Sequence, residues 1–91
     1  NRIIGYEVVS IGTLTASLVH PREVFVGALL QKSAGVIIAH NHPSGEITPS
    51  PEDKETTRRL AKAGEILGVP VLDHLIVGDG KYFSFKESGL L

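Results

Sequence analysis

Apolar side chains along this sequence follow the patterns of five strands. Residues 2–11 are rich in isoleucine, tyrosine and valine, and residues 13–18 alternate polar and apolar side chains with the period of a half-buried strand. Residues 35–39 form a short unbroken apolar run, as in a strand that is covered on both faces. Residues 71–77 form a further apolar strand, and residues 81–85 follow a glycine-rich turn, so these two segments can pair as a hairpin.

Two other segments carry apolar residues at helical spacing. The first begins at Pro21, a residue type that favours the first helical position, and runs to about Lys32. The second has Ser50 as its N-cap and Pro51 at its first position, and it is expected to end near Leu67, where a glycine follows. The order strand, strand, helix, strand, helix, strand, strand predicts an α/β fold in which helices cover a mixed sheet.

The segment between residues 40 and 53 contains the side chains of a candidate metal site. His40 and His42 are one residue apart, seven residues then precede Ser50, and two more precede Asp53. Two imidazoles and one carboxylate suit a catalytic zinc ion, which usually keeps three protein ligands, whereas structural zinc takes four ligands that are mostly cysteine. The chain has no cysteine. The pattern therefore favours a hydrolytic zinc centre over a structural one.

The expected secondary structure allows these three ligands to meet. Side chains two residues apart on an extended segment point to the same face, so His40 and His42 can bind one ion. Asp53 lies in the first turn of the predicted helix and shares its sheet-facing stripe with Thr57, Leu60, Gly64 and Leu67. The positive end of the helix dipole helps to keep this carboxylate ionised and ready to coordinate.

Several of these polar residues also have a purely structural interpretation. Ser50 with Asp53 is a good capping box, a common motif that carries no chemistry of its own, although Asp53 can cap the helix and bind an ion at once. His74 lies in an apolar strand, where a buried imidazole that is hydrogen-bonded to its neighbours is favoured over a fourth ligand or a supporting role behind the ligands. Glu46 is expected to be a solvated loop residue, and the direction of Glu7 is left open.

Composition and charge limit the classes of function. Its 91 residues and 42% hydrophobic content suit one small globular domain. Nine basic and ten acidic residues give a net charge of −1, which argues against binding to a nucleic-acid backbone. No apolar run approaches the roughly 18 residues of a membrane span, and the lack of cysteine is compatible with a reducing cytoplasm, so we expect a cytoplasmic protein without a membrane partner. Because the chain opens on a strand pattern and contains no methionine, we expect it to be part of a longer protein.

The ligand spacing resembles a known motif. The JAMM metal motif of the JAB/MPN metallopeptidase superfamily has the same order: His-x-His, seven residues, Ser, two residues, Asp. Within that superfamily the chain resembles the bacterial RadC family, on His-Asn-His-Pro-Ser-Gly at 40–45, on Pro-Ser-x-x-Asp at 49–53, and on the segments 12–14, 20–24, 72–77 and 82–89. The resemblance implies a three-layer α/β domain of the cytidine-deaminase-like type, a mixed sheet with flanking helices. It also implies one domain over residues 1–91 that lacks the N-terminal strand of the family.

For chemistry, the resemblance implies a zinc-dependent hydrolase that cleaves an amide or isopeptide bond in a peptide or protein substrate. The Zn²⁺ would be held by His40, His42 and Asp53, with an activated water at the fourth position. The serine that matches Ser50 helps to hold the oxyanion of the tetrahedral intermediate. The glutamate that takes the proton from the water belongs, in the family, to a strand that would precede Asn1, and nothing in this chain matches it.

Other functions stay open beside the hydrolase. A role in DNA repair is traditionally attached to the RadC name, although the charge balance argues against direct contact with a duplex. A non-catalytic interaction module that keeps the zinc ligands is a further alternative. The adjacent letters His-Asn-His at 40–42 do not make an HNH endonuclease, whose residues are spaced along a hairpin and a helix. A zinc deaminase is set aside, because its signature needs glutamate where this chain has His42 and cysteines that the chain lacks.

Overall fold

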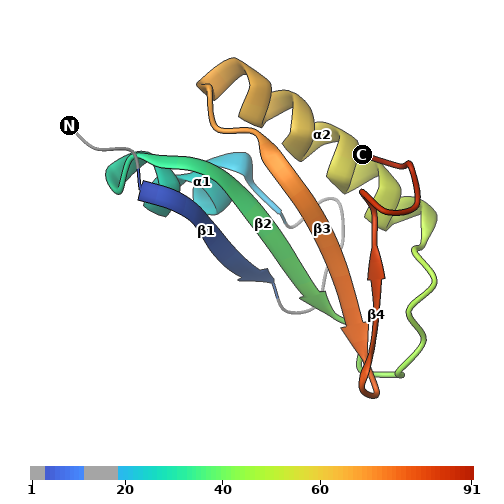
Figure 1. The fold of residues 1–91 in the computed structure, drawn as a ribbon. Coiled ribbons are helices and arrows are strands. Elements are labelled where there is room, and N and C mark those ends of the chain that lie inside the picture. The colour runs from blue at the N-terminus through green and yellow to red at the C-terminus, as the bar shows by residue number, and fades with distance from the viewer. Residues whose placement is uncertain (1–3, 12–18) are drawn as a thin grey trace.

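One sheet and two helices make up the described part of the molecule (Figure 1). The computed structural model describes residues 4–11 and 19–91. In chain order the elements are β1 (Ile4–Ile11), α1 (Pro21–Leu30), β2 (Ser33–Asn41), α2 (Pro51–Leu67), β3 (Val71–Gly78) and β4 (Lys81–Ser84). The sheet has the order β1-β2-β3-β4, in which β1, β2 and β3 are parallel and β4 is antiparallel to β3. The predicted mixed sheet with two helices is confirmed, whereas the strand predicted at 13–18 lies outside the described residues.

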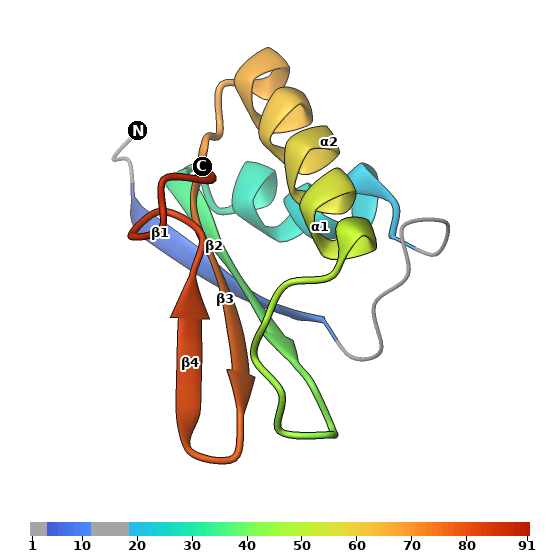
Figure 2. The same ribbon diagram turned by 90° about the vertical axis from the view of Figure 1, so that its right-hand side faces the viewer.

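Both helices lie against the same face of the sheet, as the two perpendicular views show (Figure 1, Figure 2). The core between the layers is built from fully buried side chains of α1, α2 and β2: Phe25, Ala28, Val36, Ile38 and Leu60. On the opposite face, Tyr6 and Val8 of β1 are exposed. The described residues therefore supply two of the three layers that the family resemblance implies.

Strand β2 extends beyond the apolar run at 35–39 at both of its ends. His40 is in register with Ile11 of β1 and with Ile76 of β3, so pairing on both sides continues past the last apolar residue. His40 thus lies inside the sheet, rather than in a loop after it. His42 follows directly after the strand, and its backbone N–H still donates to a carbonyl of β3.

Helix α2 has the predicted boundaries because local signals fix both of its ends. The Ser50 hydroxyl accepts a hydrogen bond from the N–H of Asp53, and the Asp53 carboxylate accepts one from the N–H of Ser50, which is the predicted capping box. At the other end, Gly68 adopts a left-handed φ of 75°, which residues with a side chain rarely take. The stripe that begins at Asp53 is buried as predicted through Thr57, Leu60 and Gly64, although Leu67 is exposed.

Two boundaries differ slightly from prediction. Helix α1 ends at Leu30 rather than near Lys32, whose left-handed φ of 57° is incompatible with a continuing helix. Strand β4 ends at Ser84, because Phe85 begins a turn.

Among the helices of the described residues, none has the length and apolar content needed to cross a membrane.

Candidate metal centre

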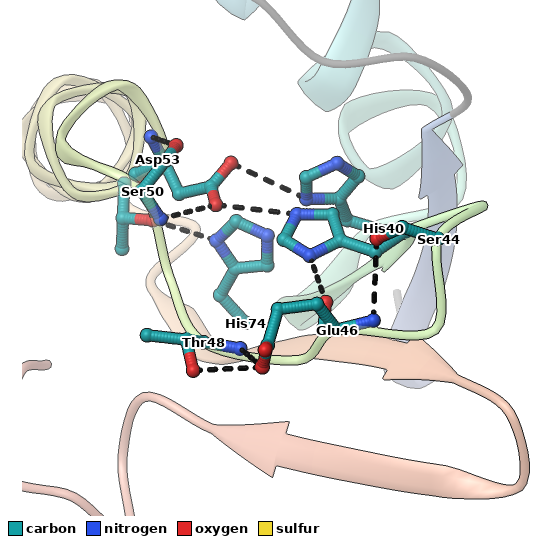
Figure 3. A network of polar contacts seen from close by, with 9 residues as sticks. His40, Ser44, Glu46, Thr48, Ser50, Asp53 and His74 are labelled. Atoms are coloured by element: carbon teal, nitrogen blue, oxygen red, sulfur yellow. Dashed lines mark hydrogen bonds and ion pairs between the residues drawn. The ribbon is translucent and has the colours of Figure 1, made fainter.

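Two histidines and one aspartate meet where the end of β2 faces the first turn of α2 (Figure 3). Nδ1 of His40 lies 3.6 Å from Oδ1 of Asp53, and Nε2 of His42 lies 3.3 Å from Oδ2 of the same carboxylate. One nitrogen or oxygen atom from each of the three residues lies within 4.8 Å of the other two. The structure therefore brings together the three residues that the sequence predicts as metal ligands.

The donor set and its spacing fit a divalent metal ion. Zinc bonds of about 2.0–2.1 Å in a tetrahedral site place neighbouring ligand atoms roughly 3.3–3.4 Å apart, close to the separations of the Asp53 oxygens from the two imidazoles. Nδ1 of His40 is buried and has no hydrogen-bond partner among the described residues. A metal ion between this nitrogen and the Asp53 carboxylate would bind both, which would explain why the buried nitrogen has no hydrogen bond. These three residues could hold a metal ion.

Burial favours the ligating form of the first histidine. His40 and Asp53 are almost completely buried, whereas His42 is half-buried. Burial lowers the pKa of His40 below its ordinary value, the nearby Asp53 carboxylate opposes this effect, and His42 adds a smaller lowering. The lowered pKa favours the neutral imidazole of His40, which is the form that binds metal.

The second histidine is oriented by the loop that follows it. Nδ1 of His42 lies 2.5 Å from the backbone carbonyl of Glu46, so this nitrogen donates to the loop and leaves Nε2 directed at Asp53. Metal-binding histidines generally have their other ring nitrogen fixed in this way. The loop itself rests on the hairpin, because a Cβ atom on Gly78 would lie only 3.0 Å from the Cα of Gly45. The close approach of these two glycines sets the distance between the loop and the sheet.

Ser50 lies beside the centre rather than among its ligands. Its hydroxyl oxygen accepts from the Asp53 N–H at 3.0 Å, so its own hydrogen is available to a further acceptor. Its backbone N–H donates to Oδ2 of Asp53 at 2.7 Å, which fixes the carboxylate that also faces His42. The capping function of Ser50 is therefore observed, and its predicted catalytic function stays a prediction.

Glu46 and Glu7 do not reach the three candidate ligands. The Glu46 carboxylate accepts hydrogen bonds from the hydroxyl and the N–H of Thr48, which lower its pKa, and its side chain is exposed as predicted. Glu7 pairs in register with Val36, well before the histidines on β2, and it is half-buried. Besides Asp53, no carboxylate of the described residues belongs to the candidate ligand group.

A third imidazole lies behind the ligands. His74 of β3 is completely buried, and its ring centre is 5.8 Å from that of His40. Its Nδ1 lies 2.6 Å from the Thr57 hydroxyl, but its Nε2 is buried without a hydrogen-bond partner in the described residues. Burial lowers the pKa of His74 to about 4, and His40 contributes a smaller lowering. The sequence-based prediction of a buried imidazole is confirmed, but only one of its two nitrogens is hydrogen-bonded.

Asp73 of β3 holds the chain segment that packs against His74. Oδ1 of Asp73 accepts from the backbone N–H groups of His74 and Lys86, and Oδ2 accepts from the hydroxyl of Ser84 at 2.6 Å. These bonds fix the turn after β4, where the Phe85 ring stacks on the His74 ring with centres 4.6 Å apart and planes 7° from parallel. Sequence reasoning missed the contributions of Thr57 and Phe85, and the signal for Thr57 was its position one helical turn after Asp53.

The chain matches the family model of the RadC-like JAB domain over residues 1–90. A UPF0758 protein of Symbiobacterium thermophilum and another of Trichlorobacter lovleyi are each 63% identical to it over 91 residues, which is the whole of this chain but only 39% and 40% of those proteins. A UPF0758 protein of Methanococcoides burtonii is 57% identical over the same 91 residues. The chain therefore spans about two fifths of the length of these curated relatives.

Proposed function

Because the chain belongs to the family of RadC-like JAB domains, we propose that it is the metal-binding domain of a zinc-dependent hydrolase of the JAMM type. The reaction is cleavage of an amide or isopeptide bond in a peptide or protein substrate. The observation that carries the proposal is the convergence of His40, His42 and Asp53 in a site with one buried nitrogen left unbonded among the described residues. Two imidazoles and a carboxylate leave the fourth position of a zinc ion open for chemistry.

The residues of the chain have separate tasks in this proposal. His40, His42 and Asp53 hold the ion, and zinc in such a site supplies a Lewis acid that activates water and polarises a carbonyl group. The Ser50 hydroxyl keeps its hydrogen while its oxygen accepts from Asp53 N–H, so it can donate to the oxygen on which charge develops when the carbonyl is attacked. The hydrogen bond from His42 to the Glu46 carbonyl keeps that imidazole in place as charge builds up.

The general base is expected outside this chain. The Glu46 carboxylate is bonded to Thr48, and the Glu7 carboxylate lies against Gly27 of α1. The relatives continue for more than half of their length beyond the part matched here. We assign the base to that remainder of the protein, in agreement with the glutamate that the JAMM resemblance implies.

The experiment that tests the proposal is metal analysis of the intact protein combined with a peptide-hydrolysis assay. We expect about one zinc per chain, by analogy with mononuclear hydrolytic sites, and loss of both zinc and turnover in His42→Ala. Glu52→Gln is the matched control, because Glu52 is an exposed carboxylate in the same helical turn as Asp53. Zinc-free protein with all three ligands intact would falsify the assignment.

A second candidate function is a metal-binding interaction module without turnover. The observation that favours it is the absence of a second carboxylate from the candidate ligand group in the described residues. In that case the intact protein would bind zinc and its partner but would not hydrolyse any member of a broad peptide and isopeptide library. If His42→Ala still binds the partner, the interaction does not depend on the metal ion.

A further inference from the structure

The proposed ligands leave one buried nitrogen near the centre unexplained. Nε2 of His74 is buried in a residue with 0% exposure, and no described residue forms a hydrogen bond with it. Burying a polar atom without a partner is unfavourable, so such an atom in a native structure calls for an explanation. The surroundings of His74 supply one.

The Thr57 hydroxyl determines which nitrogen of His74 carries the proton. Its Oγ1 donates to the backbone carbonyl of Asp53 at 2.8 Å and lies 2.6 Å from Nδ1 of His74. A hydroxyl has one hydrogen, and a carbonyl can only accept, so both contacts are hydrogen bonds only if Nδ1 is the donor to Thr57. In the neutral ring the proton is then on Nδ1. Nε2 keeps a free lone pair and is an acceptor.

The direction of this lone pair is fixed by packing. Figure 3 shows the His74 ring beside the Asp53 carboxylate, with the nitrogen that has no dashed line on the edge of the ring nearer His40. The ring centres of His74 and His40 are 5.8 Å apart. Phe85 stacks on the His74 ring with planes 7° from parallel, which fixes the plane of the imidazole, and a 180° flip of the ring in that plane would lose the hydrogen bond to Thr57.

His74 is placed behind the ligands and is not itself one of them. The Asp53 oxygens already lie 3.3 and 3.6 Å from the nitrogens of His42 and His40. The group of ligand atoms that lie within 4.8 Å of one another includes these three residues and not His74. With His40, His42 and Asp53 as its protein ligands, a zinc ion would have its fourth position open to a molecule from solvent or substrate.

We propose that Nε2 of His74 is a hydrogen-bond acceptor for the donor molecule at this open position, which is water in the resting protein. Thr57 and Phe85 hold the acceptor in place, so His74 is a positioning residue and not a catalytic one. The inference rests on the proposed metal site and deepens it. A water molecule held there would direct one hydrogen towards Nε2 of His74, so this side chain would orient the molecule that the ion activates.

Binding of Co²⁺ to the intact protein tests this role through two pairs of matched variants. In His74→Asn the amide nitrogen replaces Nδ1 and nothing replaces Nε2, whereas in His74→Gln the amide oxygen can take the position of Nε2. Loss of a residue that supports the groups around a metal ion by hydrogen bonding typically lowers metal affinity 10- to 100-fold. We therefore expect the Kd for Co²⁺ to rise about tenfold in His74→Asn and to stay within about threefold of wild type in His74→Gln.

Thr57 gives a second test that leaves the imidazole unchanged. Thr57→Val removes the hydroxyl that keeps the proton on Nδ1, whereas Thr57→Ser retains it, so only the valine variant should weaken Co²⁺ binding. X-ray absorption of the Zn²⁺ protein should count two imidazole ligands in wild type and in all four variants. Circular dichroism of the metal-free proteins shows which variants fold. If one variant of the His74 pair is unfolded, the Thr57 pair decides the question, and the converse holds as well.

The outcomes separate this inference from the function on which it rests. Three imidazole ligands in wild type would make His74 a ligand and overturn the acceptor role. Equal Co²⁺ affinity in His74→Asn and His74→Gln, or in Thr57→Val and Thr57→Ser, would overturn it as well. Wild-type protein that binds no Co²⁺ would instead overturn the metal site itself.

Discussion

Asp53 serves the helix and the candidate metal site with one carboxylate. Oδ2 accepts the N–H of Ser50 at 2.7 Å and faces His42 at 3.3 Å, while Oδ1 faces His40. The N–H of Ser50, the positive end of the helix dipole and a bound cation would all attract the negative charge of this carboxylate. Capping and coordination therefore reinforce each other, and the presence of a capping box at Ser50 is no argument against a metal site.

The two functions of this turn can be separated by substitution. Ser50→Ala removes the N-cap acceptor but no candidate ligand, so we expect the free energy of unfolding to fall by about 1 kcal/mol and the zinc Kd to change less than about threefold, well below the 10- to 100-fold effect of a lost ligand partner. Asp53→Asn keeps an oxygen for the Ser50 N–H but loses the charge, and should abolish zinc binding. Urea unfolding and zinc titration measure the two quantities. Retained zinc affinity in Asp53→Asn would show that the ion binds elsewhere.

The pKa of His74 predicts how stability depends on pH in the metal-free protein. Its folded pKa of about 4 lies below the unfolded value of 6.5, so between these values the unfolded chain binds more protons and stability rises with pH. This contribution is complete above pH 6.5 and is lost as the pH falls towards 4. Linkage gives a loss of about 2 kcal/mol between pH 7 and pH 5.

Urea unfolding in the presence of a chelator at several pH values measures this slope. His74→Phe has no ionisable ring, so its free energy of unfolding should depend less steeply on pH than that of wild type. Burial lowers the pKa of His40 as well, so a smaller slope of the same sign should persist in the variant. An unchanged slope would mean that another group titrates.

At the scale of elements, the loop after β2 is positioned by its contact with the β3–β4 hairpin. A Cβ atom on Gly78 would meet the backbone of Gly45 at 3.0–3.2 Å, which requires the loop to move by a few tenths of an ångström. That loop carries His42 and the Glu46 carbonyl that orients it. The spacing between the backbones of Gly45 and Gly78 therefore affects the position of the His42 side chain.

Gly78→Ala tests this coupling. We expect a loss of about 1–3 kcal/mol in the free energy of unfolding from overpacking, together with weaker zinc binding. Gly5→Ala is the matched control, because its added Cβ atom meets nothing within 4 Å and should leave both quantities nearly unchanged. Full zinc affinity in Gly78→Ala would show that the loop adjusts without moving His42.

The predictable parts of the fold are those that local signals determine. Both ends of α2 follow from Ser50-Pro51 and Gly68, and the approach of Asp53 to the histidines follows from helical and strand periodicity. The sequence analysis assumes extended structure at the histidines, but the pairing that holds His40 within β2 was not predictable, because it depends on two strands that are distant in sequence. The unbonded nitrogen of His74 was not predictable for the same reason, since Thr57 reaches it from another element.

At the scale of the whole molecule, metal binding is expected to be coupled to folding, since only the folded chain holds β2 and α2 face to face. Zinc at 100 times its Kd should raise the free energy of unfolding by about 2.7 kcal/mol. Thermal unfolding with added zinc, and again after chelation, measures the effect and its reversal. Asp53→Asn should show no such gain. An equal gain in that variant would locate the ion at another site, such as the exposed His20.

All three proposed ligands belong to one continuous strand, loop and helix, whereas His74 comes from the next strand along the chain. The loop between β2 and α2 is short, so bringing these three ligands together costs little closure entropy once the folded sheet holds the two elements face to face. Removal of an ion is therefore expected to loosen this one continuous segment first, while the strand that carries His74 stays paired in the sheet.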